Sequence, residues 1–189
     1  MGILKFIWTF LADSFQTLIL AASIFLIIYI FLFRPFQVDG ISMFPTYKDG
    51  EYVLTNIITL RMNKLQRGDV IVFQAPDAPD KDYIKRIIGL PGNTVSLHDG
   101  FVYINNEKLN ESAYLASDVK SYGGAFLKDD DPVTVPADNY FVMGDNRPMS
   151  SDSRTFGFVK FEAVVGKSYF VYWPIANMRL IKNPYISTN

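Results

Sequence analysis

Cysteine is absent from the 189-residue chain, and histidine occurs once, as His98. Without cysteine the chain has no disulfides, no thiol nucleophile and no thiolate metal ligands. A single histidine excludes a multi-histidine metal site and leaves His98 as the only candidate for a histidine base. Because it directly precedes the turn signal Asp99-Gly100, we interpret His98 as an exposed turn residue. We therefore expect neither a metal nor a cofactor.

An excess of positive charge is also lacking, since 18 Lys and Arg residues stand against 19 Asp and Glu residues. Proteins that bind nucleic acid usually carry a basic patch, so we expect no nucleic-acid partner. The chain is also short. Domains usually contain about 100–200 residues, which leaves room for one domain beside any membrane segment.

A long uncharged stretch is present near the N-terminus. Residues 18–33 read LILAASIFLIIYIFLF, and the stretch without charge extends back to Ser14. About 20 apolar residues span the hydrocarbon core of a bilayer, so this segment predicts a transmembrane helix. A buried core helix would rarely lack a polar face. A cleavable signal peptide would need small residues where RPFQVDG follows, so we predict a retained anchor within residues 1–35.

The charges beside this segment do not give its orientation. Lys5 and the terminal amine precede it, whereas Arg34 and Lys48 follow it, so the positive-inside rule is nearly balanced. Residues 3–13 are apolar with one tryptophan and fit either an interfacial helix or an extension of the span.

Short apolar runs rich in β-branched and aromatic residues follow Phe36, separated by Gly, Asp, Asn and Pro. They predict a mostly β, antiparallel domain over residues 36–189. The turn signals Asp99-Gly100 and Asn105-Asn106 flank FVYI and indicate a meander of short strands. The polar segment 110–134 is interrupted by glycines and is expected to form a long loop. The runs expected to form strands are EYVLTNII, GDVIVFQA, NTVSLHDGFVYINNEKL, NYFVMGD and VVGKSYFVYWPI.

Three stretches carry candidate chemistry. In VDGISMFPT, Ser42 lies between Gly40 and Pro45, residues that restrict the backbone, so it is either a turn serine or a positioned nucleophile. In DYIKRIIGLPGN, Lys85 and Arg86 are adjacent in an apolar strand, so one of them points towards the apolar side or a cleft. A buried lysine loses its charge more readily, and a neutral Lys85 could serve as general base in a Ser-Lys dyad.

The third stretch, MGDNRPMSSDSRTFGFV, places many polar residues between two apolar strands. It is either a solvated loop or a set of groups that partner one another as the loop packs inwards. Asp152 and Arg154 are candidates for an ion pair, and a serine of this stretch could hydrogen-bond an amine.

Taken together, these stretches resemble the type I signal peptidases, membrane-anchored serine proteases that remove signal peptides from exported preproteins. SMFPT resembles the nucleophile box, RGDVIVF the strand after it, DYIKRIIGLPGN the lysine box and GDNRPMSSDSRTFGFV the last box, in family order behind an anchor. The resemblance covers residues 36–173 and is weakest over residues 117–131.

The resemblance implies roles for individual residues. Ser42 is similar to the nucleophile, Lys85 to its general base and Ser150 to the serine that orients the lysine amine. Asp152 and Arg154 resemble a structural ion pair, while Asp145 and Arg147 match loop positions to which we assign no role. The positions that resemble the walls of two shallow apolar pockets for small side chains are Phe36, Val38, Met43, Tyr83 and Ile84.

One position departs from many members of this family. Gly40 stands where a serine hydroxyl often helps to bind the oxyanion, so the backbone N–H of Ser42 is expected to carry that role with some other group. The resemblance also implies the family's coiled antiparallel sheet, a cytoplasmic N-terminus and an extracytoplasmic catalytic domain at the cell membrane. The implied partners are preprotein signal peptides, cut after small residues as in A-x-A, and membrane lipid.

Two other functions fit parts of the sequence. A tethered binding module would leave Lys85 exposed with an ordinary pKa. A self-cleaving Ser-Lys regulator would need a DNA-binding region, and none is recognisable before Phe36.

Overall fold

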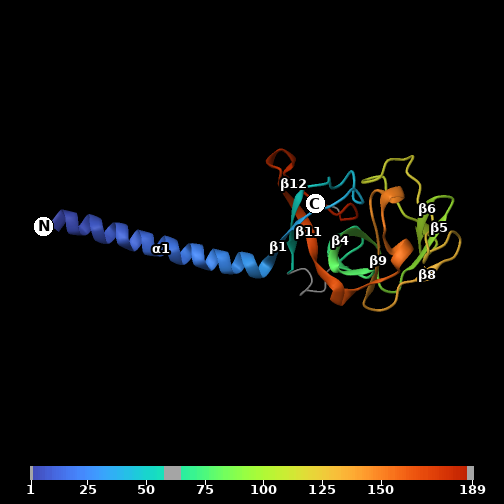
Figure 1. Ribbon diagram of the computed structural model, residues 1–189, viewed down its shortest axis with the longest axis horizontal. Helices are drawn as coiled ribbons and strands as arrows, with labels where there is room; N and C mark the ends of the chain where they lie inside the picture. The colour runs from blue at the N-terminus through green and yellow to red at the C-terminus, as the bar shows by residue number, and fades with distance from the viewer. Residues whose placement is uncertain (1, 58–64, 187–189) are drawn as a thin grey trace. The chain divides into compact units, whose positions relative to one another are not determined.

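The computed structural model describes residues 2–57 and 65–186, and we discuss these ranges (Figure 1). The chain divides into two compact units, Met1–Phe33 and Arg34–Asn189.

The first unit is a single helix, α1 (Gly2–Leu32), which continues through residues 3–13 without a break. Its segment Lys5–Leu26 is long and apolar enough to cross a membrane. The hydroxyls of Thr17 and Ser23 donate hydrogen bonds to the carbonyl oxygens of Asp13 and Ile19, at 2.8 Å each. These bonds satisfy polar groups inside the helix, as an apolar environment requires.

The second unit is built on a sheet of eight strands, with the order β1-β2-β11-β3-β4-β9-β10 and β12 paired to β11. The strand pairs among β2–β4 and β9–β12 are antiparallel. This arrangement confirms the prediction of a mostly β, antiparallel domain. The strands are β1 (Phe33–Gln37), β2 (Tyr52–Asn56), β3 (Val70–Ala75), β4 (Ala78–Gly89), β9 (Asn139–Met143), β10 (Val159–Lys160), β11 (Val164–Trp173) and β12 (Arg179–Leu180).

A second, four-stranded sheet has the order β7-β6-β5-β8. Its strands are β5 (Thr94–His98), β6 (Phe101–Ile104), β7 (Glu107–Lys108) and β8 (Val133–Thr134). The two predicted turns are present, and Asp99, Asn105 and Asn106 have φ values between 52° and 69°, in the left-handed region that Asn and Asp tolerate. His98 ends β5 with 58% of its side chain exposed, as expected.

Alternating buried residues of both sheets form three apolar clusters. One cluster joins β5 and β6 to β9 through Leu97, Val102 and Phe141. Another packs β3 and β4 against β9 through Ile71, Ile87 and Val142. The third contains Val38, Met43, Tyr47, Val53, Val70 and Val171 and lies behind the turn that carries Ser42. Burial of these side chains is the main stabilising contribution to this unit.

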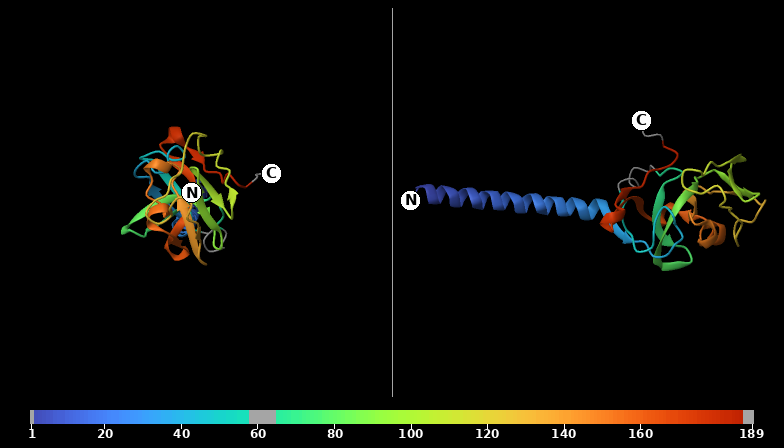
Figure 2. Two further views of the ribbon diagram at one scale, coloured as in Figure 1. Left: turned by 90° about the vertical axis from the view of Figure 1, so that its right-hand side faces the viewer. Right: turned by 90° about the horizontal axis from the view of Figure 1, so that it is seen from above.

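The polar segment between β7 and β8 contains no helix or strand over residues 109–132. It lies beside the small sheet, because Ser121 and Asp130 donate backbone hydrogen bonds to Gly100 and Leu97 at 2.9 Å (Figure 2). We call residues 110–127 of this segment the polar loop. The described residues of this unit also form four short helices: η1 (Arg147–Met149), α3 (Ser153–Phe156), η2 (Phe161–Ala163) and η3 (Ile175–Asn177).

Candidate active site

Ser42 lies in the turn that connects β1 to β2. The base of this turn is closed by backbone hydrogen bonds from Val38 to Glu51 at 2.7 Å and from Gly50 to Val38 at 2.9 Å. Gly40 has a φ of +92°, a conformation that favours glycine, and its N–H donates to Asp49 Oδ1 at 2.7 Å. The glycine therefore allows the chain to reverse just before Ser42.

A second loop holds the same turn from another side. The backbone N–H of Asn146 donates to the carbonyl oxygen of Ser42 at 3.0 Å, and its side chain donates to that of Ile41 at 3.1 Å. The two loops are so close at Gly144 that a Cβ there would lie 2.5 Å from the Ser42 carbonyl oxygen and would collide with the Ser150 hydroxyl. The close approach therefore requires glycine at position 144.

Lys85 lies on β4, paired with Ile71 of β3, and only 4% of it is exposed. Its Nζ lies 2.9 Å from Ser42 Oγ and donates a hydrogen bond to the carbonyl oxygen of Ile84 at 2.9 Å. Two residues that are 43 positions apart in the chain thus lie within hydrogen-bond distance.

Burial lowers the pKa of the Lys85 ammonium to about 8, and the carboxylates of Asp152, Asp77 and Asp145 oppose this shift. Moving an ammonium out of water disfavours its charged form. No carboxylate among the described residues forms an ion pair with Lys85, so burial dominates. A substantial fraction of Lys85 is therefore neutral near pH 8 and able to accept a proton.

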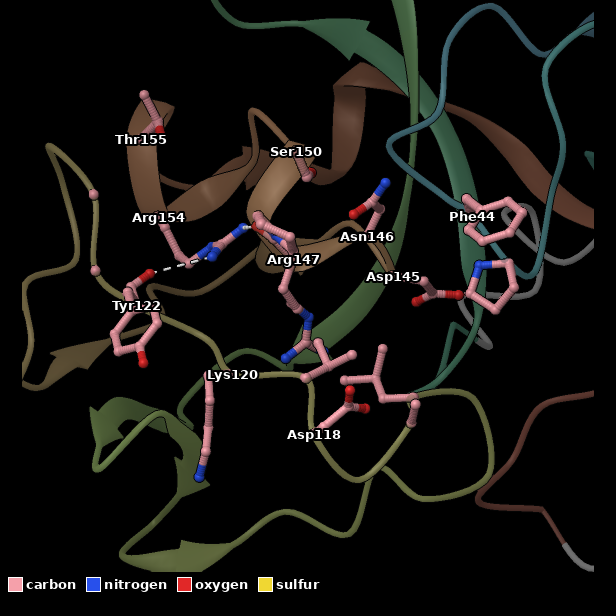
Figure 3. Close-up of a pocket in the computed structure, with 17 residues that line it drawn as sticks. Phe44, Asp118, Lys120, Tyr122, Asp145, Asn146, Arg147, Ser150, Arg154 and Thr155 are labelled. Atoms are coloured by element: carbon pink, nitrogen blue, oxygen red, sulfur yellow. Dashed lines mark hydrogen bonds between the residues drawn. The ribbon is translucent and has the colours of Figure 1, made fainter.

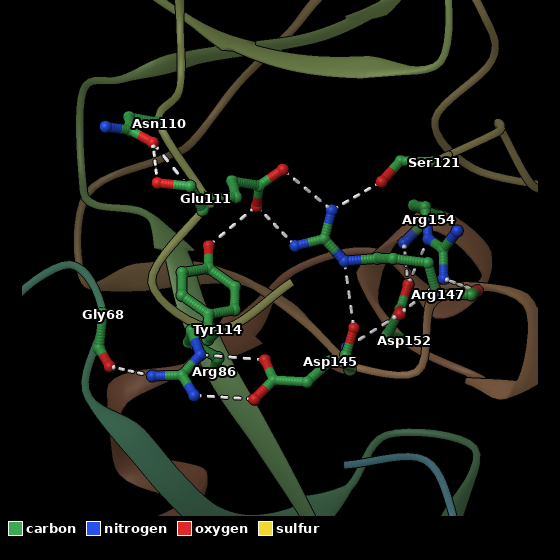
Figure 4. A network of polar contacts seen from close by, with 12 residues as sticks. Gly68, Arg86, Asn110, Glu111, Tyr114, Ser121, Asp145, Arg147, Asp152 and Arg154 are labelled. Carbon is green, nitrogen blue, oxygen red and sulfur yellow. Dashed lines mark hydrogen bonds and ion pairs between the residues drawn. The ribbon is translucent and has the colours of Figure 1, made fainter. Parts of the chain in front are cut away.

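Arg86 points away from Ser42 on the opposite face of β4 and is also buried, with 2% exposed. It binds Asp145 with both prongs of its guanidinium, Nε to Oδ1 at 2.8 Å and Nη2 to Oδ2 at 2.6 Å (Figure 4). The guanidinium also donates to the carbonyl of Gly68 at 2.8 Å and lies 4.2 Å from the ring centroid of Tyr114. Both adjacent cations of this strand are therefore buried, one on each face.

Asp152 and Arg154 form an ion pair, with Nη2 and Oδ2 2.8 Å apart. Asp152 is also the N-cap of α3, where its side chain accepts the backbone N–H of Arg154, and its other oxygen accepts the N–H of Gly144 at 3.0 Å. Arg154 donates to the carbonyl oxygen of Arg147 at 2.7 Å. The pair therefore joins both ends of the loop that contacts Ser42.

Arg147 connects this loop to the polar loop. Its guanidinium forms an ion pair with Glu111 and donates a hydrogen bond to the Ser121 hydroxyl (Figure 4). From the sequence alone, Arg147 has no assigned role and Glu111 is not singled out. Nothing in a single sequence marks this pair, because its members lie 36 residues apart on segments of different character.

Ser150 Oγ is buried and has no hydrogen-bond partner among the described residues, so a contact with the lysine amine stays a prediction. The backbone N–H of Ser42 likewise donates to no described residue, whereas that of Gly40 is occupied by Asp49. The Ser42 N–H is thus free to bind a ligand oxygen.

A cleft of about 440 Å³ contains both Ser42 and Lys85. Phe36, Val38, Tyr83 and Ile84 line it, four of the five residues expected there. Met43 is instead 1% exposed and packs in the third apolar cluster behind the cleft. The polar residues Asp39, Asp82 and Ser151 also line the cleft and were not anticipated.

The family described as "Signal peptidase, peptidase S26" matches residues 11–173. The chain is 40% identical over 171 residues to a signal peptidase I of Bacillus amyloliquefaciens, covering 88% of each chain, and 41% identical over 169 residues to signal peptidase I S of Bacillus subtilis (strain 168), covering 87% of this chain and 90% of that one. A crystal structure of a signal peptidase I from Enterococcus faecalis V583 is 38% identical with a TM-score of 0.46, covering 55% of this chain and 96% of that one. With an antiparallel β domain whose Ser42 and Lys85 share one cleft, the chain belongs to the signal peptidase family of serine endopeptidases.

Proposed function

We propose that this protein removes N-terminal signal peptides from exported preproteins, with Ser42 as nucleophile and Lys85 as general base. The observation that carries the proposal is the separation of 2.9 Å between Ser42 Oγ and the buried Lys85 Nζ in one cleft. A neutral Lys85 accepts the hydroxyl proton as Oγ attacks the carbonyl carbon of the scissile peptide bond. The Ser42 N–H stabilises the oxygen that becomes negative in the tetrahedral intermediate.

The second half of the reaction uses the same groups. The Lys85 ammonium returns its proton to the nitrogen of the leaving chain, which leaves an acyl ester on Ser42. The neutral amine then takes a proton from water, whose oxygen attacks the ester and releases the signal peptide. Asp152 and Arg154 position the loop beside Ser42, and Ser150 is assigned to orient the lysine amine.

The helix α1 supports a membrane anchor in this proposal. Its segment Lys5–Leu26 exposes large apolar side chains along the length needed to cross a bilayer. The proposed orientation has the N-terminus in the cytoplasm and the catalytic domain outside the membrane. Anchoring both the enzyme and its substrate in one lipid bilayer raises their effective concentration, so weak pockets suffice.

The cleft predicts selection of small side chains. We expect bulky residues at the first and third positions before the cut to be rejected, because the side chains of Phe36, Val38 and Ile84 line the cleft that contains Ser42. In detergent, a preprotein with an A-x-A site should be cut after its last alanine. Replacement of that alanine by leucine should lower kcat/KM by about 100-fold, which steric misfit near a reacting bond commonly causes. Mass spectrometry of the products identifies the cut, and equal rates for both preproteins would contradict the proposed specificity.

The pH dependence tests the role of Lys85. Only the neutral amine accepts the serine proton, and the pKa of Lys85 is lowered to about 8. Below this pKa the neutral fraction falls about tenfold per pH unit, so kcat/KM should rise with pH and level off above it. The rate is measured on the full chain in detergent across neutral and alkaline pH. A profile without a rise would rule out Lys85 as the base.

The binding-module alternative predicts an exposed Lys85 with an ordinary pKa. The buried position and lowered pKa of Lys85 favour the enzyme instead.

A further inference from the structure

A second cavity, of about 750 Å³, is larger than the cleft that contains Ser42 and Lys85. We call it the loop cavity, because the polar loop and the loop after β9 form most of its wall (Figure 3). Its lining residues from the polar loop include Leu115, Val119 and Tyr122, and Phe44 and Pro45 complete it from the Ser42 turn. No step of the proposed reaction uses this cavity.

The loop cavity and the cleft are adjacent. Ser151 lines the cleft and its neighbour Ser150 lines the loop cavity, so the chain at this point forms the boundary between the two. The turn that carries Ser42 also lies between the two, because Ser42 lines the cleft and Phe44 lines the loop cavity. Asn146, whose N–H binds the Ser42 carbonyl oxygen, also lines the loop cavity.

A polypeptide substrate continues on both sides of the bond that is cut. If the residues before the bond occupy the cleft, those after it must leave Ser42 in another direction. An extended chain advances by about 3.3 Å per residue, so the first few residues of the mature protein are within reach of the neighbouring cavity.

The charges in the wall decide which side chains fit. Arg147 and Arg154 line the cavity, but each guanidinium is already paired, with Glu111 and Asp152 respectively. Lys120 lies over the ring of Phe101, 3.6 Å from its centroid. The carboxylates of Glu111 and Asp152 balance the two guanidinium charges, and Asp118 in the same wall opposes the charge of Lys120, so the cavity has no excess of positive charge for an anion. Phe44, Leu115 and Val119 instead provide an apolar surface, and 51% of Phe44 is exposed there.

We propose that the loop cavity binds the segment of the substrate immediately after the cut and accepts an apolar side chain from it. This inference rests on the proposed function, since it assigns the leaving part of a preprotein to the cavity. The polar loop then contributes to substrate selection. The ion pair between Glu111 and Arg147 holds the polar loop at the site. Both are positioning residues rather than catalytic residues.

The test uses the full chain in detergent and a set of preproteins that share one A-x-A site. One member has glycine at each of the first four mature positions, and the others carry a single leucine at one of them. Wild type should cleave one leucine member with a kcat/KM about tenfold above the glycine member, the scale of selectivity that an apolar pocket gives.

Two variants and a control locate that preference. Leu115→Asp and, separately, Val119→Asp should reduce the leucine-to-glycine ratio to about one, because a carboxylate in the wall opposes an apolar side chain. Neither should alter the discrimination between alanine and leucine before the cut. Leu180→Asp, at a residue that is 64% exposed and lines neither cavity, should leave both ratios unchanged. Thermal unfolding of each variant checks that it is folded.

The outcomes separate the two proposals. Cleavage at the A-x-A site with no dependence on the mature residues would overturn the loop-cavity proposal alone. A leucine preference that persists in both aspartate variants would also overturn it, because the preference would then arise elsewhere. No cleavage of any member would overturn the proposed function and this inference together.

Discussion

Ser42→Ala and Lys85→Ala are each expected to lower the rate of preprotein cleavage by at least about 10⁴-fold, the scale seen when a nucleophile or its base is removed from other serine proteases. Without Oγ no acyl ester forms, and without Nζ the hydroxyl at 2.9 Å has no base to take its proton. The double variant should be no slower than either single variant, because the two groups act as one unit. Lys85→Arg should also be inactive, since a guanidinium stays protonated.

Matched controls make this result interpretable. Lys81→Ala removes an exposed lysine from the same strand, β4, and Thr134→Ala removes an exposed hydroxyl from β8, away from the cleft. Both should cleave the A-x-A preprotein at the wild-type rate. Cleavage is measured in detergent with the full chain, and circular dichroism with thermal unfolding shows that each variant is folded. If Ser42→Ala or Lys85→Ala cuts as fast as the controls, the dyad is not the catalytic unit.

Arg86→Leu should destabilise the domain by about 3–5 kcal/mol, the usual result of removing one partner of a buried ion pair. The substitution leaves the Asp145 carboxylate, whose side chain is 0% exposed, without its bidentate partner. It also leaves the Gly68 carbonyl without its donor. For a domain of this size the midpoint of thermal unfolding should fall by on the order of 10 °C.

A double variant distinguishes the loss of the ion pair from the cost of leaving one charge buried without a partner. Arg86→Met combined with Asp145→Leu should recover most of the lost free energy of unfolding, because no charge then remains buried alone. Lys81→Leu, which removes an exposed charge on the same strand, should change stability by no more than about 0.5 kcal/mol. A single Arg86→Leu variant as stable as wild type would show that Asp145 is accommodated without this partner.

Local patterns were sufficient for the fold class and for the two residues proposed to react. Period-2 runs and Asp-Gly or Asn-Asn turns are short-range signals, and the strands lie where those signals place them. Adjacent Lys85 and Arg86 in an apolar strand predicted one unusual environment, but the structure has two. The same sequence pattern would be compatible with an Arg86 side chain that is exposed to solvent.

Short-range sequence signals could not predict ion pairs between distant residues or which side chains line the cleft. Asp145 lies 59 residues from Arg86, and only the pairing of β4 with β9 brings them together. Met43 was expected on a pocket wall and is in the core, because an apolar residue beside the nucleophile fits both places. The resemblance is weakest over residues 117–131, and Glu111, which pairs with Arg147 of the loop after β9, could not be identified from the sequence.

Lys85 and Arg86 point to opposite faces of β4, so the number of residues in this strand matters as much as their identity. A strand shifted by one residue presents every side chain to the other face. A single-residue deletion between the β3–β4 turn and Lys85 would therefore move Arg86 into the position opposite Ile71, beside Ser42, and would place Ile87 at the position that now binds Asp145. Both sites would be lost without any change in their chemical groups. Natural variation in this strand should thus proceed by substitution, while insertions and deletions accumulate in the turns on either side.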